Sequence, residues 1–302
     1  MTEPVPQPLS RASDFHPEVL RLFDQYVHGA LDRRGFVQAA SKFAVGGVSA
    51  AALLEALSPR FAQAQQVPAG DSRIATSHLE FASPQGYGKG RGYLARPAKT
   101  QGPLPVVLVL HENRGLNPHI EDIARRLAVD NFIAFAPDAL FTLGGYPGDE
   151  DKARTLFAQL DQRKAQEDFV AAAGFAAGLE GGNGKLGAVG FCYGGGIVNL
   201  LATRVPTLAA GVPFYGNAAP LDRVPQIKAQ LLIVFAQNDE RINAAWPPYE
   251  AALKSAGVRY EAVTYPGTEH GFNNNTTPRY DDAAARLAWG RTLALFNRTL
   301  RG

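Results

Sequence analysis

Cys192 is the only cysteine in the 302-residue chain, and it lies in the glycine-rich segment 190–196, which reads GFCYGGG. An apolar run at 185–189 precedes this segment, and a run suited to a helix, 197–202, follows it. A strand, a sharp turn and a helix in this order are typical of a nucleophile elbow, here with cysteine in place of serine. Small neighbours suit such a turn, because the nucleophile has a strained backbone and its flanks pass close together. The pattern indicates a nucleophilic thiol; the alternatives are a buried cysteine that acts as a small hydrophobe and a phosphate-binding turn.

Two further candidate residues come after apolar segments later in the chain. Segment 229–236 reads as a buried strand and is followed by Asp239, and segment 260–265 reads as a strand whose following loop contains His270. The carboxyl ends of strands are where an α/β sheet carries its chemistry. The order nucleophile, acid, histidine is that of the α/β-hydrolases. Alternatively, Asp239 caps a helix at 244–255, and His270 is only a turn residue.

A fourth candidate precedes the cysteine. The apolar segment 104–110 predicts a strand, and it leads into a loop with Glu112 and Asn113 before a helix at 120–128. In α/β-hydrolases this loop supplies one amide of the oxyanion hole, and the residue after the nucleophile supplies the other. The backbone N–H groups of Asn113 and Tyr193 are therefore the expected oxyanion hole. Glu112 is unusual there, because a carboxylate disfavours a nearby oxyanion, so it either serves the nucleophile or is an exposed loop residue.

The remaining segments predict the scaffold that positions these residues. Segments 78–83 and 90–96 read as an antiparallel pair, and segments 131–138 and 208–216 read as further strands. A helical pattern covers 149–179, and a closing helix is expected over 283–300. Strands that alternate with helices predict an α/β fold, with a mostly parallel central sheet and helices on both faces. We expect residues 72–302 to form this one catalytic domain.

Taken together, the motifs around residues 112, 192, 239 and 270 resemble the dienelactone hydrolase family, over roughly residues 77–300 and in its bacterial branch with a signal-like extension. The resemblance implies that Cys192 is the nucleophile, that His270 and Asp239 are its partners, and that Glu112 helps to generate the thiolate. Family members that act on dienelactone hold the substrate carboxylate with arginines, one of them soon after the histidine. Here residues 273–275 are all asparagine, and 148–154 shows no clear counterpart of the other arginine. This difference argues against dienelactone itself as the substrate.

The front of the chain has a different character. Residues 1–71 form an expected N-terminal extension, in which the pair Arg33 and Arg34 resembles a twin-arginine export signal. A mildly apolar run at 44–57 and an Ala-Gln-Ala pattern at 62–64 are typical of a leader and its cleavage site. We therefore expect a periplasmic protein that the twin-arginine machinery exports, without a stable membrane span, since the apolar run is short. The alternative is a helical arm that packs on the domain of a cytoplasmic protein.

Composition narrows the possible partners. The net charge is +2 with scattered Lys and Arg, so the chain carries no basic footprint for nucleic acid. A single cysteine excludes a thiolate zinc cluster, and the six histidines are dispersed, so we expect no metal and no cofactor. The expected partner is a small ester or lactone, cleaved through a thioester intermediate. A broad-specificity carboxylesterase and a non-catalytic binding protein are the alternatives, and the oligomeric state is not assigned.

Overall fold

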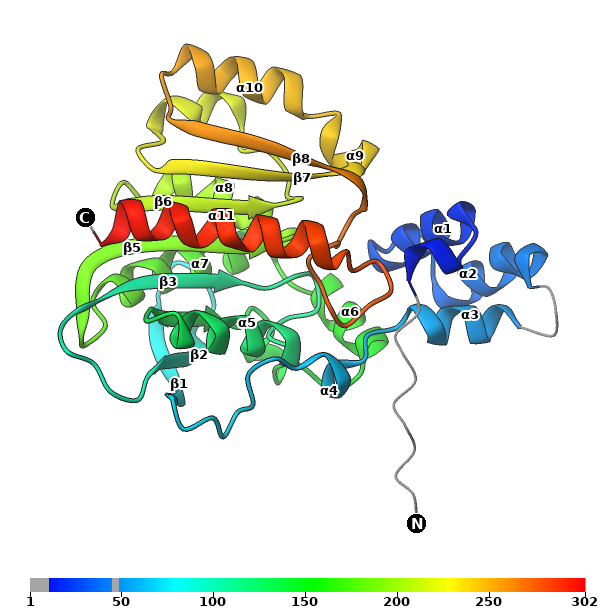
Figure 1. The fold of residues 1–302 in the computed structure, drawn as a ribbon, viewed down its shortest axis with the longest axis horizontal. Helices are drawn as coiled ribbons and strands as arrows, with labels where there is room; N and C mark the ends of the chain where they lie inside the picture. The colour runs from blue at the N-terminus through cyan, green and yellow to red at the C-terminus, as the bar shows by residue number, and fades with distance from the viewer. Residues whose placement is uncertain (1–10, 45–48, 302) are drawn as a thin grey trace.

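The computed structural model describes residues 11–44 and 49–301. Residues 1–10 of the predicted extension and 45–48 of its apolar run lie outside the described residues. The fold is built on one eight-stranded sheet with the order β1-β2-β4-β3-β5-β6-β7-β8 (Figure 1). The strands are β1 (Ile74–Ser83), β2 (Gly88–Pro97), β3 (Leu104–Leu110), β4 (Ile133–Pro137), β5 (Gly182–Phe191), β6 (Leu208–Phe214), β7 (Gln230–Asn238) and β8 (Tyr260–Glu269).

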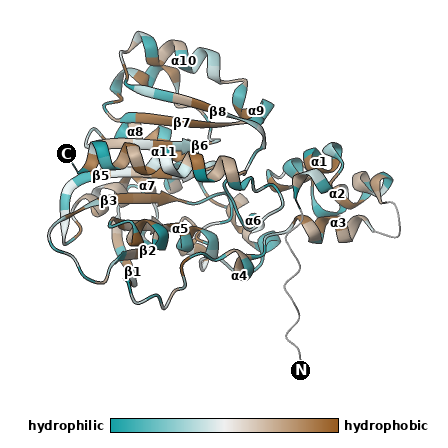
Figure 2. Cartoon of the chain, in the orientation of Figure 1, coloured by the Kyte–Doolittle hydropathy of each residue, from teal (hydrophilic) through white to brown (hydrophobic). Residues whose placement is uncertain are grey.

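In the order given, the sheet is parallel from β4 to β8, and β2 alone is reversed, because it pairs antiparallel with both of its neighbours, β1 and β4. The predicted antiparallel opening pair is therefore confirmed. Strands β3 and β7 are apolar along most of their length and appear brown in Figure 2. Strands that are buried on both faces read as continuous apolar runs, which explains why both were visible in the sequence.

Helices cover both faces of the sheet, as the predicted α/β fold requires. The helices α5 (Pro118–Val129) and α11 (Asp282–Leu300) pack with one face of the sheet. The other face is covered by α6 (Glu150–Ala158), α7 (Gln162–Ala177), α8 (Tyr193–Arg204) and α10 (Trp246–Ser255). The helical pattern predicted over 149–179 is thus two helices rather than one. The helical conformation is interrupted at 159–161 because Asp161 caps α7. Its carboxylate accepts hydrogen bonds from the backbone amides of Arg163 and Lys164.

Residues 11–64, which we call the N-terminal segment, form in their described part a small helical layer of their own. Its helices are α1 (Pro17–Val27), α2 (Arg33–Ala40), α3 (Ala50–Leu57) and the short α4 (Phe61–Ala64). Apolar side chains of α1, α2 and α3 form a core separate from the two cores of the sheet. Helices α1 to α3 lie beyond the carboxyl ends of the parallel strands (Figure 1). The N-terminal segment is therefore next to the edge of the sheet where the candidate site residues were expected.

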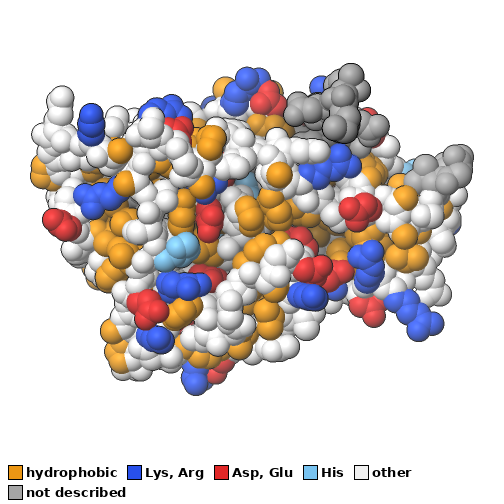
Figure 3. Space-filling model, turned by 90° about the horizontal axis from the view of Figure 1, so that it is seen from below, with side chains coloured by type: hydrophobic (Ala, Val, Ile, Leu, Met, Phe, Trp, Pro, Cys, Tyr) orange, Lys and Arg blue, Asp and Glu red, His pale blue; other side chains and the backbone are white. Residues whose placement is uncertain are grey.

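The short elements complete the description. The four-residue helix α9 (Glu240–Asn243) follows β7, and 3-10 turns lie at Ala12–Asp14, Ser41–Phe43, Phe141–Leu143 and Leu221–Gln226. Over residues 11–44 and 49–301, no helix combines the length and the apolar character needed to cross a bilayer. On the face drawn in Figure 3, acidic and basic side chains are interspersed rather than gathered into one patch.

Candidate active site

Cys192 lies between β5 and α8 with a left-handed backbone, φ +54° and ψ −112°. The turn is tight enough that only glycine fits at positions 190 and 194. A Cβ atom on Gly190 would lie 2.2 Å from the carbonyl oxygen of Gly194, and one on Gly194 would lie 2.1 Å from that of Leu110. The strained conformation persists because these contacts and the bond from the Cys192 amide to Phe214 O (3.0 Å) hold it on both sides. This is the geometry that the glycine-rich sequence predicted.

Asp239 and His270 form a buried pair at the ends of β7 and β8. The Oδ2 atom of Asp239 lies 2.5 Å from Nδ1 of His270, and both residues are only 4% exposed. The other oxygen, Oδ1, accepts from the Ile242 amide at 3.4 Å and so caps α9. The carboxylate therefore caps a helix and orients an imidazole at the same time. The helix is α9 (Glu240–Asn243) and not the one expected over 244–255, which has no side-chain cap. The remaining nitrogen of His270, Nε2, is buried without a hydrogen-bond partner among the described residues.

The thiol and the imidazole rings lie close enough to share a proton. One ring nitrogen of His270, one of His28 and Sγ of Cys192 all lie within 4.8 Å of one another. Burial on its own raises the pKa of the Cys192 thiol, but the positive charges of His270 and His28 and the hydrogen bond to His28 outweigh burial and hold it well below its usual value. Burial lowers the pKa of His270, while the Cys192 thiolate and Asp239 raise it to about 10. The pair is thus set up as thiolate and imidazolium.

Glu112 faces the same site from the loop after β3. Its Oε2 accepts from the side-chain amide of Asn274 at 2.9 Å, so the second of the three asparagines holds this carboxylate. Burial, followed by the charge of the Cys192 thiolate, raises the pKa of Glu112, although Arg279, His270 and Asn274 oppose the shift. A carboxyl group with a raised pKa next to a thiol is able to take up a proton. Glu112 is therefore part of the site and is not a freely exposed loop residue.

The loop after β3 is fixed by His111, which is fully buried. Its Nε2 accepts from the Ala139 amide at 3.1 Å, which makes this ring neutral at that nitrogen and ties the loop to the segment after β4. Burial lowers the pKa of His111, in keeping with a structural role. The close approach of Gly194 to Leu110 and His111 places the first turn of α8 against this loop. The amides of Asn113 and Tyr193 therefore belong to two segments that meet beside Cys192.

His28 is a site residue that sequence reasoning missed. It follows α1 in the N-terminal segment, and its Nε2 lies 3.4 Å from Sγ of Cys192. Its ring packs edge-on against His270, with centroids 4.8 Å apart. Its Nδ1 lies 2.8 Å from the Asp24 carbonyl oxygen and 3.2 Å from Oδ1 of the same residue. No local pattern marks His28, because only the packing of α1 against the sheet brings it to the thiol.

The three clustered side chains also bear on metal binding. Two imidazole nitrogens and one thiolate would suit a soft divalent cation. However, Nε2 of His28 also lies 3.1 Å from the guanidinium group of Arg241, which a cation at that nitrogen would have to displace. The arrangement favours hydrogen bonding to the thiol over metal coordination.

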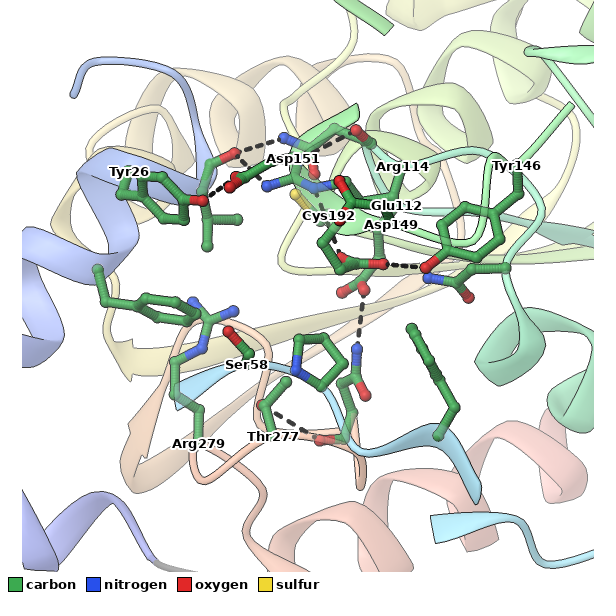
Figure 4. A pocket seen from close by; sticks show the side chains of 18 of the residues that line it. Tyr26, Ser58, Glu112, Arg114, Tyr146, Asp149, Asp151, Cys192, Thr277 and Arg279 are labelled. Atoms are coloured by element: carbon green, nitrogen blue, oxygen red, sulfur yellow. Dashed lines mark hydrogen bonds and ion pairs between the residues drawn. The ribbon is translucent and has the colours of Figure 1, made fainter. Parts of the chain in front are cut away.

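Two cavities meet at Cys192. The larger, of about 380 Å³, contains Glu112, Arg114 and Arg279, and Figure 4 shows Tyr26 reaching it from α1. The smaller, of about 310 Å³, lies on the other side of His28 and is lined mostly by apolar and aromatic side chains, among them Phe157, Tyr193, Tyr215 and Ile242. Cys192, Val27 and Asn113 line both. The residues that follow α1 thus divide one cleft into two chambers with the thiol between them.

Two arginines of the larger cavity were also missed. Arg114 is 5% exposed and has Nε at 3.5 Å from the Glu150 carboxylate, and Arg279 is 8% exposed and pairs with Asp24 at 3.5 Å. Arg279 follows the three asparagines rather than replacing one of them, so a search at fixed spacing after His270 does not find it. These cations give the larger cavity a positive component beside its carboxylates.

A mostly parallel sheet covered on both faces, a strained glycine-lined turn between a strand and a helix, and an acid and a histidine at the ends of later strands define an α/β-hydrolase. Within this class, residues 91–300 match the model of the dienelactone hydrolase family, and residues 7–45 match a second model described as YqhI-like. The chain belongs to the dienelactone hydrolase family, and it is a hydrolase that acts on ester or lactone bonds.

Curated relatives agree with this assignment. The chain is 33% identical to a putative carboxymethylenebutenolidase of Escherichia coli K12 over 219 residues, which cover 68% of this chain and 80% of that one. It is 51% identical over 114 residues to a putative hydrolase fragment, YghX, of the same organism, which covers 38% of this chain and 97% of that one.

Solved structures share the fold. A putative dienelactone hydrolase from Klebsiella pneumoniae is 30% identical, with a TM-score of 0.64 over 74% of this chain and 99% of that one. A thermostable esterase from Pseudomonas putida is 17% identical, with a TM-score of 0.64 over 95% of this chain and 99% of that one. At 17% identity, the similarity to the esterase concerns the fold alone, but the matched part of this chain extends into the N-terminal segment.

Proposed function

We propose that the chain hydrolyses esters or lactones with Cys192 as the nucleophile, His270 and Asp239 as its triad partners, and a thioester as the intermediate. The observation that carries the proposal is the buried cluster of Cys192 and His270 at the strained turn, with His270 bound to Asp239 at 2.5 Å. A free cysteine has a pKa of about 8.5 and is mostly protonated at neutral pH, so a site that lowers the pKa of the thiol is needed for attack.

In the first half-reaction, the thiolate attacks the carbonyl carbon. The C–O bond to the alcohol then breaks as His270 gives its Nε2 proton to the departing oxygen, which leaves the imidazole neutral. Glu112 and His270 are the groups that take the thiol proton. Burial raises the pKa of Glu112, whereas burial lowers the pKa of His270 and the Cys192 thiolate outweighs it, so both pKa values are raised. The backbone amides of Asn113 and Tyr193 hold the oxyanion. One such donor typically contributes about 3 kcal/mol to the transition state.

In the second half-reaction, His270 takes a proton from water, and the hydroxide adds to the thioester carbonyl. The C–S bond then breaks, which releases the acid and restores the thiolate. Asp239 keeps His270 in the tautomer that leaves Nε2 free to accept this proton. The buried Nε2 without a partner supports this role.

The two cavities support a substrate with two unlike arms. The larger cavity carries Arg114 and Arg279 together with several carboxylates, whereas the smaller, although Arg154 and Arg241 line it, has the more apolar wall. We propose that the polar part of an ester or lactone occupies the first, the apolar part occupies the second, and the carbonyl lies at Cys192 between them. Arg114 and Arg279 place cations in the larger cavity although residues 273–275 carry none.

The test is turnover of p-nitrophenyl acetate and of an ester and lactone panel by the full chain and by Cys192→Ala. We expect the wild type to turn over activated esters and to lose activity when one equivalent of iodoacetamide modifies its single thiol. Acid-quenched mixtures should contain an acyl adduct on the peptide with Cys192. Turnover that survives in folded Cys192→Ala would overturn the nucleophile assignment.

A separate proposal concerns location: Arg33 and Arg34 act as an export signal for the periplasm. Both side chains are exposed at the start of α2, which leaves them available for recognition. The Ala-Gln-Ala pattern lies in α4, and the Ala64 carbonyl accepts a hydrogen bond from the buried side-chain amide of Asn275 at 2.6 Å. This contact favours export without cleavage of the N-terminal segment. Replacing both arginines by lysine should keep the protein in the cytoplasm on fractionation; an unchanged distribution would favour the arm alternative.

A further inference from the structure

We propose that Asp24 and His28 form a second histidine–aspartate pair at the nucleophile, in which His28 donates a hydrogen bond to the Cys192 thiolate and Asp24 positions the ring. The N-terminal segment then completes the catalytic site instead of only preceding it. This inference rests on the proposed nucleophile and adds a residue to its site.

The first support is the way in which the catalytic domain binds the end of α1. The last carbonyls of a helix have no partner within the helix and carry its negative dipole end. Here the Val27 carbonyl accepts from the Asn113 side chain at 2.9 Å and from Arg114 at 3.2 Å, and the Tyr26 carbonyl accepts from Arg154 at 3.0 Å. Polar groups of the domain thus hold the helix end at the position that puts the next residue, His28, on the thiol.

The second support is the set of contacts on the His28 ring. Nδ1 faces the carbonyl and the carboxylate of Asp24, two acceptors, so this nitrogen carries a proton. Nε2 faces Sγ of Cys192 at 3.4 Å, with Arg241 at 3.1 Å and the ring of His270 beside it. A proton on Nε2 gives the thiolate a donor; because the Arg241 guanidinium can only donate, this bond requires that Arg241 turn away from Nε2.

The charges around the pair agree with this assignment. Burial lowers the pKa of His28, but Asp24 and Cys192 outweigh burial and raise it, with His270 opposing. Asp24 has a lowered pKa despite its burial, because His28, His270 and Arg279 all face it. The other charged groups that face this cluster are Glu112, Arg114 and Arg241. The pair therefore repeats the arrangement of Asp239 and His270, with the two imidazole rings packed against each other beside Cys192.

The experiment is alkylation of the single thiol by iodoacetamide as a function of pH, in the full chain and in His28→Asn. The readout needs no ester turnover, so it separates this inference from the proposed hydrolysis. We expect the apparent pKa of alkylation to rise by about one unit in the variant, which reduces the rate by about tenfold at pH values below the wild-type pKa and leaves it unchanged at pH values well above both. A profile that coincides with the wild type would overturn the inference.

His16→Asn is the matched control, because it makes the same substitution at the other end of α1. Asparagine is a good N-cap residue, and His16 is the N-cap of this helix. The control should follow the wild-type profile. If His28→Asn fails to fold, Asp24→Asn decides: it keeps the His28 ring and removes its charged partner, and we expect a shift in the same direction. An unshifted profile in folded Asp24→Asn would then overturn the role of the pair.

Discussion

Asp239 binds His270 through one carboxylate oxygen and caps α9 through the other. Asparagine keeps the cap but removes the charge that orients the imidazole. We expect Asp239→Asn to lower kcat/KM for p-nitrophenyl acetate by about a thousandfold, while the free energy of unfolding changes by less than about 1 kcal/mol. Asp161→Asn makes the same change at the cap of α7, away from the site, and should keep full activity. Equal activity in the two variants would contradict the triad.

Glu112 is expected to serve the thiol more than the fold. Glu112→Gln removes the proton acceptor beside Cys192 but keeps a group that can bond to Asn274. We expect iodoacetamide alkylation at neutral pH to slow by roughly tenfold, with little change in melting temperature. Glu121→Gln, on α5, is the comparison and should alkylate like the wild type. If the Glu112 variant gives the wild-type profile, this carboxylate has no part in forming the thiolate.

The nucleophile turn should tolerate a methyl group at one glycine of α8 and reject it at another. A Cβ on Gly194 would lie 2.1 Å from a backbone oxygen of Leu110, which cannot move aside, whereas the nearest atom to one on Gly196 is at 3.5 Å. Gly194→Ala should therefore lower the free energy of unfolding by about 3 kcal/mol. Gly196→Ala should leave it unchanged or raise it by up to about 1 kcal/mol. Denaturant unfolding measures both, and similar values for the two would refute the predicted packing.

Stability should fall in acid because of His119. Burial on α5, and then the charge of Arg126, lower the pKa of His119 from its ordinary value of 6.5 to about 3. The unfolded chain therefore takes up a proton that the folded chain refuses, and stability is lost as the pH falls from about 6.5 towards 3. Between pH 6.5 and 4.5, His119→Gln should lose about 2–3 kcal/mol less than the wild type. The exposed His78→Gln serves as the control, and a variant as acid-sensitive as the wild type would contradict the assignment.

The α/β fold and the meeting of four residues could be predicted because each leaves a local trace. Buried parallel strands are apolar runs, and Glu112, Cys192 and Asp239 each come soon after one, whereas His270 follows the mostly exposed edge strand β8. His28 leaves no such trace, since its position depends on how Arg114 and Arg154 bind the end of α1. For the same reason, a chain starting at Gln65 keeps the four predicted residues but loses a contact to the thiol that the sequence did not reveal.

The division of the cleft has a consequence for the order of release. Cys192 opens to both chambers, so in the proposed reaction the alcohol leaves from one chamber while the acyl group stays bound in the other. Water can then reach the thioester through the vacated chamber without displacing the acyl group. The kinetic pattern that follows is ping-pong: the alcohol leaves through one chamber before water enters through that same chamber.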